Sequence, residues 1–211
     1  MKTILFDLDG TLLDGEAPSV KIVEQLFAQK GVYLSQEDVD FAWGRPIPEV
    51  YEQLCIKYEL KHQFDDMLRM QNVRYLETLS ATVLLFPQVE LVLERLKAFG
   101  YTIGLVTGSN REEVSKVFDR FEFDQFFEVV VCRDEVQNGK PDPEGFLLAA
   151  QKLEVSPVDC VVIEDSDAGV RAGLAAGMEV IGVQHGTSQK LRSAASVVET
   201  IAAIQPLLLG E

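Results

Sequence analysis

The feature that most constrains the fold is a regular alternation of short apolar runs and helical stretches from residue 83 onward. Strand-like apolar runs occur at residues 101–106, 127–131, 160–163 and 180–183. Stretches with apolar residues at helical spacing accompany them, at residues 89–99, 110–118, 143–153 and 166–176. Strands that alternate with helices of about ten residues are typical of a parallel sheet. We therefore predict an α/β fold with a doubly wound parallel sheet.

Residues 15–82 interrupt this alternation. They hold few strand signals and four amphipathic stretches, at residues 19–29, 36–42, 48–58 and 64–79. Helices with one apolar face bury that face against one another, so we predict a small helical bundle inserted after the first strand. The predicted domains are an α/β core of residues 1–14 and 83–211 and a helical insert of residues 15–82, with connections near residues 14–18 and 80–87. Apolar side chains at helical spacing are expected in the core of the insert: Tyr51, Leu54, Met67 and Met70.

The overall charge limits the partners that this chain can bind. Its 211 residues carry a formal net charge of −15, and a surface this acidic repels nucleic acid and anionic lipid. No apolar run reaches the length of a membrane-spanning helix, and the first residues meet an acid too early for a signal peptide. The three cysteines are widely spaced without a CxxC pair, so we expect free thiols in a cytoplasmic protein. No pattern indicates the oligomeric state.

Two carboxylates directly follow the first apolar run, at residues 3–6. Asp7 and Asp9 are spaced i, i+2, so in a strand they share a face, and Gly10 then permits a tight turn. Burying two carboxylates so close together is costly unless a cation compensates. Taken alone, this segment fits an acid-rich turn equally well.

Three later segments are expected at the same edge of the sheet. They are Thr107-Gly108-Ser109-Asn110, Gly139-Lys140-Pro141 and Glu164-Asp165-Ser166. Taken singly, the first is most often a helix N-cap, the second a surface turn and the third a cap with a solvated charge. Their joint occurrence with the aspartate pair is improbable as coincidence, because the carboxyl ends of parallel strands meet at one edge.

These residue types suit the transfer of a phosphoryl group. A carboxylate can attack phosphorus to form an acyl phosphate, and hydroxyl and backbone N–H groups at a helix start hold phosphate oxygens. A lysine neutralises charge on the nucleophile and on the transferring group. Further carboxylates bind Mg²⁺, which prefers oxygen ligands.

The chain resembles the haloacid dehalogenase superfamily of phosphotransferases, in the branch with a helical cap inserted after the first motif. The matching stretches are FDLDGTLLDGE, LVTGSN, NGKPDPEGFLLAA and VVIEDSDAGVRAGLAAGMEVIGV. They run through most of the core, whereas the insert matches loosely. The resemblance implies a Rossmann-like core with a cap of residues 15–82. It also implies a phosphoric monoester hydrolase that uses Mg²⁺ and an aspartyl-phosphate intermediate.

By this resemblance, five residues carry the chemistry and the metal. Asp7 would be the nucleophile. Asp9 would be the general acid and base, and its backbone carbonyl would reach the metal. Lys140 would pair with Asp7 and the phosphoryl group. Asp165 would bind Mg²⁺ together with Asp7 and Asp9, and Glu164 would be a further ligand, direct or through water.

Substrate binding is expected from two other segments. By the resemblance, Thr107 would bind phosphate with help from the amides of Gly108 and Ser109, and Asn110 is a further candidate. In the insert, Arg45 lies between two predicted helices and could grip a substrate anion with two hydrogen bonds. A solvated turn is the alternative reading for Arg45.

Three functions stay open at this point. Asp9 favours a phosphatase acting on a small phosphorylated metabolite, because dehalogenases and phosphonate hydrolases of this superfamily lack an aspartate there. The first alternative is a sugar-phosphate mutase of the β-phosphoglucomutase type. Such mutases usually carry a histidine shortly after the position of Asp14, where this chain has Ser19, and a lysine where it has Asn110. The second alternative is a phosphate-binding module without activity, which would gain nothing from the costly aspartate pair.

Overall fold

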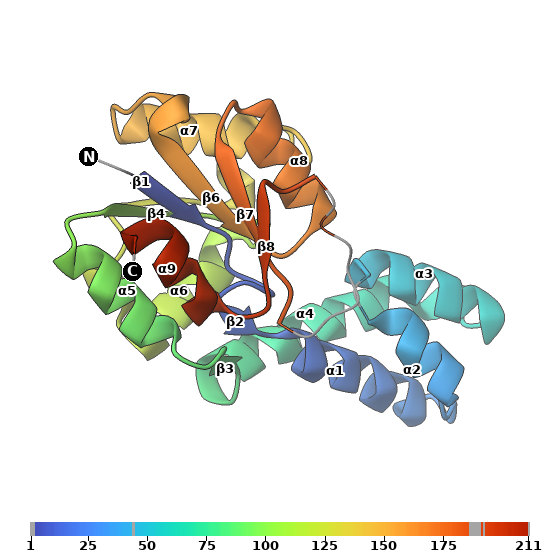
Figure 1. The fold of residues 1–211 in the computed structure, drawn as a ribbon. Coiled ribbons are helices and arrows are strands. Elements are labelled where there is room, and N and C mark those ends of the chain that lie inside the picture. Colours follow the sequence, from blue (N-terminus) through green and yellow to red (C-terminus); the bar gives the residue numbers. More distant parts are fainter. Residues whose placement is uncertain (1–2, 44, 186–190, 192, 211) are drawn as a thin grey trace. The chain divides into compact units, whose positions relative to one another are not determined.

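The chain divides into two compact units in the computed structural model, which describes residues 3–43, 45–185, 191 and 193–210. Unit 1 consists of Met1–Asp14 and Leu84–Glu211, and unit 2 consists of Gly15–Val83. Figure 1 draws both, coloured from blue at the N-terminus to red at the C-terminus. The functional domains expected from the sequence, 1–14 with 83–211 and 15–82, stay a prediction.

Unit 1, over its described residues, is built on a six-stranded sheet in the order β5-β4-β1-β6-β7-β8 (Figure 1). All neighbouring strands are parallel. β1 lies in the interior, where Ile4 pairs with Ile103 of β4 and with Val161 of β6. Since the sheet grows outward from β1 on both sides, a topological switch point lies beside it, where such sheets bind ligands. The strands are β1 Thr3–Phe6, β4 Thr102–Val106, β5 Val129–Val131, β6 Cys160–Glu164, β7 Glu179–Val183 and β8 Ser196–Val198.

Helices cover both faces of this sheet. In Figure 1, α7 and α8 lie on one face, and α5, α6 and α9 lie on the other. Successive residues of a strand point to opposite faces. Accordingly, Leu5 belongs to the buried cluster that includes Phe146 of α7 and Val170 of α8, whereas Ile4 and Phe6 are buried outside that cluster. The predicted doubly wound fold is therefore confirmed. The helices are α5 Val89–Ala98, α6 Arg111–Phe121, α7 Glu144–Lys152, α8 Asp167–Ala175 and α9 Ile204–Leu209.

The sequence pattern does not predict β8, α9 or a two-stranded ribbon in unit 1. In the ribbon, β2 (Leu13–Asp14) pairs antiparallel with β3 (Leu84–Leu85), where the chain leaves and re-enters the unit. α9 contains Pro206 in its first turn, where the missing N–H has no helical acceptor to lose.

The described part of unit 2 contains four α-helices and one short 3₁₀ helix. These are α1 Glu16–Gln29, α2 Gln36–Ala42, α3 Ile47–Lys57, the 3₁₀ helix Lys61–Gln63 and α4 Phe64–Ala81. α4 packs against α1 and α3, and Tyr51, Leu54 and Met67 are buried between them, as predicted. Met70 is 40% exposed, so its predicted place in the core is wrong. The buried position on α4 is Gln71 instead, which lies one helical turn after Met67. Pro18, expected in a connection, lies in the first turn of α1.

Buried Gln71 has a partner for each end of its amide group. Its Oε1 accepts from the Tyr51 hydroxyl at 3.0 Å. Its Nε2 donates to the hydroxyl and to the backbone carbonyl of Ser19, at 3.0 and 3.2 Å. These bonds tie α4 to α1 and α3 inside the bundle.

A second polar network joins α2 to the end of α3. The buried carboxylate of Asp38 accepts from Lys57 Nζ at 2.5 Å, from the Tyr58 hydroxyl at 2.5 Å and from Ser35 Oγ at 2.7 Å. Burial alone would raise the pKa of Asp38, but the hydrogen bonds from Lys57, Tyr58 and Ser35 outweigh it and hold the pKa well below its usual range.

Among the described residues, no helix combines the length and the apolar character that spanning a bilayer requires.

Candidate active site

Asp7 extends the hydrogen bonding of β1 by one residue. Its N–H donates to the Ile163 carbonyl of β6 at 3.0 Å, and its side chain is 9% exposed. Burial raises the pKa of Asp7 to about 7, while nearby Lys140 acts in the opposite direction. A buried carboxylate that titrates near neutral pH is a candidate functional group.

Lys140 bridges two carboxylates at the carboxyl ends of the strands. Its Nζ donates to Asp7 Oδ1 at 2.5 Å, to Glu164 Oε1 at 2.6 Å and to the Val106 carbonyl at 3.0 Å. Burial alone would lower the pKa of Lys140, but Asp7 and Glu164 outweigh it and raise the pKa. The ammonium group therefore stays charged and compensates part of the buried negative charge.

Three acids form a cluster in which Asp7, Glu164 and Asp165 each have an oxygen within 4.8 Å of the others. Burial raises the pKa of Asp165 well above its usual range, and the charges of Asp7 and Glu164 raise it further. Lys140 offsets only one of these negative charges. The cluster of carboxylate oxygens therefore fits a hard divalent cation such as Mg²⁺.

Glu164 is held differently from the other two acids. Its Oε1 accepts from Lys140, and its Oε2 accepts from the N–H and the hydroxyl of Ser166, at 2.8 and 2.9 Å. Ser166 in turn caps α8, because its Oγ accepts from the Gly169 N–H at 3.0 Å. Since both of its oxygens have partners, Glu164 fits the orientation of Lys140 better than direct contact with a metal.

The turn after Asp9 brings the chain against Asp165. Gly10 has φ +85°, and a Cβ placed there would lie 2.2 Å from Asp165 Oδ2. Both the conformation and the space therefore require glycine. The next residue, Thr11, donates its hydroxyl to Asp165 Oδ1 at 3.2 Å. The turn thus positions an acid that lies 154 residues further along the chain.

The segment after β4 lies beside Asp9. Ser109 Oγ donates to Asp9 Oδ2 at 2.5 Å, and the Ser109 N–H donates to Thr107 Oγ1 at 3.0 Å. Apart from its chain neighbours, no residue that the structure describes has an atom within 4 Å of the position that a Cβ on Gly108 would occupy, so the backbone is open there. Asn110 caps α6: its side chain accepts from the Glu113 N–H at 3.0 Å. The N–H and hydroxyl of Ser109 and the side chain of Asn110 thus have partners within the chain. Binding of phosphate by the amides of Gly108 and Ser109, by Thr107 and by Asn110 stays a prediction.

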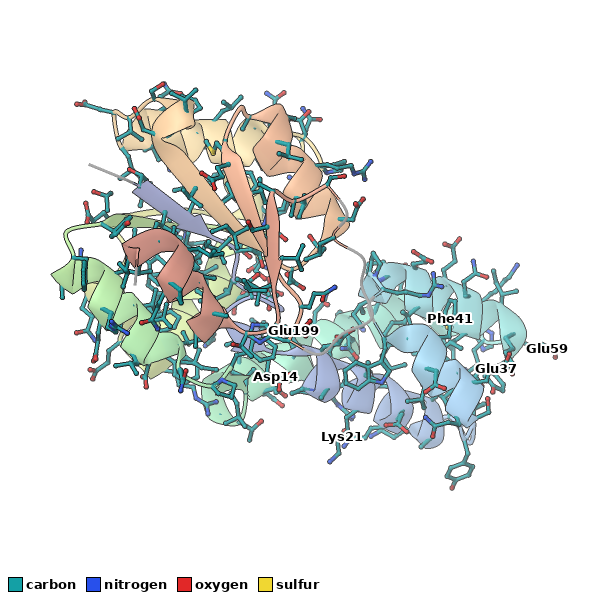
Figure 2. All side chains as sticks on the ribbon, in the orientation of Figure 1. Asp14, Lys21, Glu37, Phe41, Glu59 and Glu199 are labelled. Carbon is teal, nitrogen blue, oxygen red and sulfur yellow. The ribbon has the colours of Figure 1, made fainter. Side chains whose placement is uncertain are left out.

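Arg45 belongs to unit 2 and not to the cluster just described. It forms an ion pair with Glu49 at 3.0 Å, and its guanidinium lies 4.5 Å from the ring centroid of Phe41, which Figure 2 labels on α2. Both neighbours hold the guanidinium on the surface of the bundle. A role for Arg45 in substrate binding remains a prediction.

Three residues without a predicted role contact the predicted site or its supports: Thr11, Ser166 and His185. His185 Nε2 lies 3.0 Å from the Thr11 carbonyl, and the ring stacks on Phe86 with centroids 3.5 Å apart. Thr11 and Ser166 lie in the motifs FDLDGTLLDGE and VVIEDSDAGVRAGLAAGMEVIGV. Because each is a hydroxyl residue close to an acid in the sequence, a supporting role for it could have been predicted. His185 lies outside every motif, so no sequence pattern identifies it.

The predicted core residues therefore meet at one edge of the sheet. Asp7, Lys140, Glu164 and Asp165 form one cluster, and Asp9 joins the segment of Thr107 through Ser109. The structure thus brings groups from four separate segments of the chain together.

A comparison with models of protein families identifies the group to which this architecture corresponds. The model described as haloacid dehalogenase-like hydrolase matches residues 4–183, which include all four segments of the candidate site that the sequence analysis predicted at the edge of the sheet. The chain belongs to the haloacid dehalogenase-like hydrolase family. Its resemblance to that superfamily, predicted from the motifs, is thereby confirmed.

Curated members of the haloacid dehalogenase-like hydrolase family include phosphatases similar to this chain. Phosphorylated carbohydrates phosphatase from Thermotoga maritima is 30% identical over 186 residues, which cover 88% of this chain and 86% of the relative. Hexitol phosphatase A from Escherichia coli is 32% identical over 182 residues, covering 86% and 82%. The chain is accordingly an enzyme of the phosphatase type within this family.

Solved structures of the family share the fold. A Thermotoga maritima protein whose name proposes a beta-phosphoglucomutase matches with a TM-score of 0.87 and 28% identity, covering 100% of this chain and 99% of that one. A haloacid dehalogenase family hydrolase from Deinococcus radiodurans, solved with bound phosphate and sodium, matches with a TM-score of 0.82 and 25% identity, covering 100% and 96%.

Proposed function

We propose that this chain is a Mg²⁺-dependent phosphatase that hydrolyses a small phosphorylated metabolite through an aspartyl-phosphate on Asp7. The observation that carries the proposal is the buried Asp7 carboxylate, held 2.5 Å from Lys140 Nζ and grouped with Glu164 and Asp165. A binder of phosphate would not need a carboxylate at this position, because its negative charge repels the ligand. A carboxylate that attacks phosphorus, in contrast, has to lie next to the phosphate group, as Asp7 would.

In the first half of the reaction, an Asp7 oxygen attacks the phosphorus of the substrate. The bond from phosphorus to the ester oxygen breaks, and Asp9 gives its proton to that leaving oxygen. Lys140 stabilises the negative charge on the transferring phosphoryl group. In the second half, Asp9 takes a proton from a water molecule that attacks the same phosphorus. The bond to Asp7 then breaks, which frees inorganic phosphate and restores the carboxylate.

The metal site fits the same geometry. Asp7, Asp165 and the backbone carbonyl of Asp9 would hold Mg²⁺, which when bound neutralises phosphate charge and orients it towards Asp7. Glu164 would act on the site through Lys140, because both of its oxygens already accept hydrogen bonds. Thr107 and the amide of Gly108 would receive the phosphate oxygens.

We propose a sugar or polyol phosphate as the substrate class. Two of the similar family members act, by their names, on phosphorylated carbohydrates and hexitol phosphates, and each alignment covers more than four-fifths of both chains. Arg45 is proposed as the residue of unit 2 that contacts this substrate. A cytoplasmic location agrees with the three free, buried cysteines.

A mutase is the second candidate because of the Thermotoga maritima structure whose name proposes one. Ser19 stands where such mutases usually carry a histidine. Its hydroxyl and carbonyl both accept from Gln71, and a serine hydroxyl, unlike an imidazole, does not titrate near neutral pH. Hydrolysis is favoured for this reason.

The test is release of inorganic phosphate from a panel of hexose, pentose and hexitol phosphates, with Mg²⁺ and with excess chelator. Wild-type protein should turn over at least one of these substrates only with Mg²⁺. Asp7→Asn should abolish turnover, because an amide is a poor nucleophile, and Asp9→Asn should slow it by roughly 10²- to 10⁴-fold. Isomerisation of a hexose 1-phosphate without phosphate release would favour the mutase. Full activity in chelator, or in Asp7→Asn, would refute the mechanism.

A further inference from the structure

Lys140 sits on a loop of residues 137–142 that joins a short turn to α7. We call this segment the Lys140 loop. The turn before it is Arg133–Glu135, at the end of β5. A cavity of about 20 Å³ is lined by Gly139 and Lys140 from the loop and by Thr107 and Gly108 from the end of β4. A cavity of this size has room for about one water molecule. Towards the end of β4, the loop is linked through Lys140 Nζ, which donates to the Val106 carbonyl at 3.0 Å.

Glu144 holds the amide side of the loop. Its Oε1 accepts from the Gln137 N–H at 2.8 Å, and its Oε2 accepts from the N–H and the side-chain amide of Asn138, at 2.9 and 3.3 Å. These hydrogen bonds lower the pKa of Glu144, so the carboxylate is charged at neutral pH. Hydrogen bonds to a charged acceptor are about twice as strong as those between neutral groups.

Arg133 holds the carbonyl side of the same segment. Its Nη1 donates to the Val136 carbonyl at 2.9 Å, and Nη2 lies 3.5 Å from the Gln137 carbonyl. A Cβ on Gly139 would lie 3.1 Å from Arg133 Nε, so the guanidinium rests closely against the loop. The backbone N–H of Arg133 donates to the Ser109 carbonyl at 2.9 Å, which links this anchor to the segment beside Asp9.

The contacts of Glu144 are not those of an ordinary helix cap. Glu144 is the first residue of α7, and its own N–H is already accepted by Asp142 Oδ1 at 3.0 Å. Its carboxylate turns back to the loop, six and seven residues earlier in the chain. The helix therefore serves as the rigid support from which the loop is held.

We propose that Glu144 and Arg133 form a clamp that positions Lys140 Nζ between Asp7 and Glu164. This inference rests on the proposed function, because it assigns the clamp to the placement of a catalytic lysine. Both residues are positioning residues, since neither contacts the carboxylates of the cluster. Loss of the clamp should let the loop shift by a fraction of an ångström or more, and misplacement of about 1 Å can cost about 10²-fold in rate.

The first measurement needs no enzymatic activity. Lys140 Nζ donates to three acceptors, so its ammonium protons should exchange slowly and give a ¹H–¹⁵N NMR signal in wild-type protein. Glu144→Ala should remove that signal and speed hydrogen exchange at the amides of Gln137 and Asn138. Glu90→Ala removes an exposed glutamate from the first turn of α5 and should change neither. An unchanged Lys140 signal in Glu144→Ala overturns the clamp.

The second measurement is a double-mutant cycle on phosphate release. Glu144→Ala should lower kcat by roughly 10- to 100-fold with little change in KM, and Glu144→Gln, which keeps one acceptor oxygen, should lose less. In a Lys140→Ala background, Glu144→Ala should change kcat by less than about twofold, because a residue that acts through Lys140 has nothing left to position. Arg133→Gln should behave as Glu144→Ala does.

The outcomes separate the clamp from the proposed function. Equal losses of kcat from Glu144→Ala with and without Lys140 would show a purely structural effect and overturn the positioning role. Full activity in Lys140→Ala would overturn both proposals. If the wild-type chain released no phosphate from any substrate, the proposed function would fail. The NMR and exchange measurements would then still decide whether Glu144 holds Lys140 in place.

Discussion

Gly10 cannot be replaced by alanine without cost, because two independent effects oppose the added methyl group. The left-handed backbone at φ +85° is unfavourable for any residue with a Cβ, and that Cβ would meet the carboxylate of Asp165. Gly177 offers a comparison within unit 1. It has φ +78°, but no described residue beyond its chain neighbours has an atom within 4 Å of the position of an added Cβ. The two glycines thus separate backbone strain from collision with the site.

We predict that Gly177→Ala lowers the free energy of unfolding by about 1–2 kcal/mol, the cost of a left-handed residue, and leaves phosphate release unchanged. Gly10→Ala should carry the same cost and also reduce kcat by roughly 10²-fold or more, since Asp165 has to move. Urea unfolding and steady-state kinetics measure the two effects. Equal activities in the two variants would show that Asp165 adjusts without consequence.

Substitution of a single arginine, Arg45, tests substrate recognition. We expect Arg45→Ala to raise KM for the preferred sugar or polyol phosphate, and to leave turnover of a small aryl phosphate nearly unchanged, because the latter lacks the groups that a guanidinium would grip. Arg69→Ala is the matched control, since Arg69 is an exposed arginine of unit 2 paired with Asp66. If KM is equal for wild type and Arg45→Ala on all substrates, Arg45 belongs to a solvated turn.

At the scale of elements, the junction of α2 and α3 depends on one buried carboxylate. Asp38→Asn keeps the shape of the side chain but loses the charge that Lys57, Tyr58 and Ser35 donate to. The expected loss is about 1.5–3 kcal/mol of unfolding free energy at pH 7. Asp40→Asn, at an exposed position of α2, should stay within about 0.5 kcal/mol of wild type.

The same junction predicts a pH dependence. The pKa of Asp38 is lower in the folded than in the unfolded chain, so its stabilising effect is fully present above the unfolded value and disappears as the pH falls through the folded one. The stability difference between wild type and Asp38→Asn should therefore shrink below about pH 4. Urea unfolding of both proteins from pH 7 to pH 3 measures this, and a constant difference would contradict the assignment.

Helices and strands with a strong periodic pattern could be predicted from the sequence, whereas buried polar groups could not. The parallel sheet and the inserted helices follow from spacing alone. The predicted place of Met70 in the core is wrong because Gln71 is buried in its place. No sequence pattern predicts that a glutamine is buried, since this depends on its hydrogen-bond partners, Tyr51 and Ser19. β8 has three residues and Pro206 interrupts the apolar pattern of α9, so neither carried enough signal.

The site was predictable as a set of acids and a lysine, because strand ends converge. The hydrogen bonds within the site could not be predicted, since they depend on the conformation of loops. The bonds of Thr11 to Asp165 and of Ser166 to Glu164 join segments whose geometry no spacing rule fixes. His185 is the clearest case, because it supports Thr11 from a loop without a motif.

For the molecule as a whole, Mg²⁺ should act as a stabilising ligand. Binding to the folded state alone adds about 2.7 kcal/mol at a concentration 100 times Kd, so Tm should rise with Mg²⁺. The rise should disappear in Asp165→Asn and persist in Asp167→Asn, whose side chain is exposed and paired with Arg171.

The same site predicts that Mg²⁺ binding is linked to protons. Because the pKa of Asp7 is about 7 and that of Asp165 is raised, Mg²⁺ binding should release protons and weaken as the pH falls below about 7. Calorimetry in buffers of different ionisation enthalpy counts the protons, and none released would contradict this site.

The interior position of β1 also governs how the chain can be made. β1 leaves the ribosome well before the strands on its two sides, Thr102–Val106 and Cys160–Glu164. At roughly 5–20 residues per second, the first of them is synthesised on the order of 5–20 s after β1. Over that interval the apolar N-terminal segment has no partner, while the helices of unit 2 can already fold from local contacts. The emerging chain is thus open to aggregation and chaperone capture along this apolar segment until its neighbours have been made, and β1 becomes protease-resistant only then.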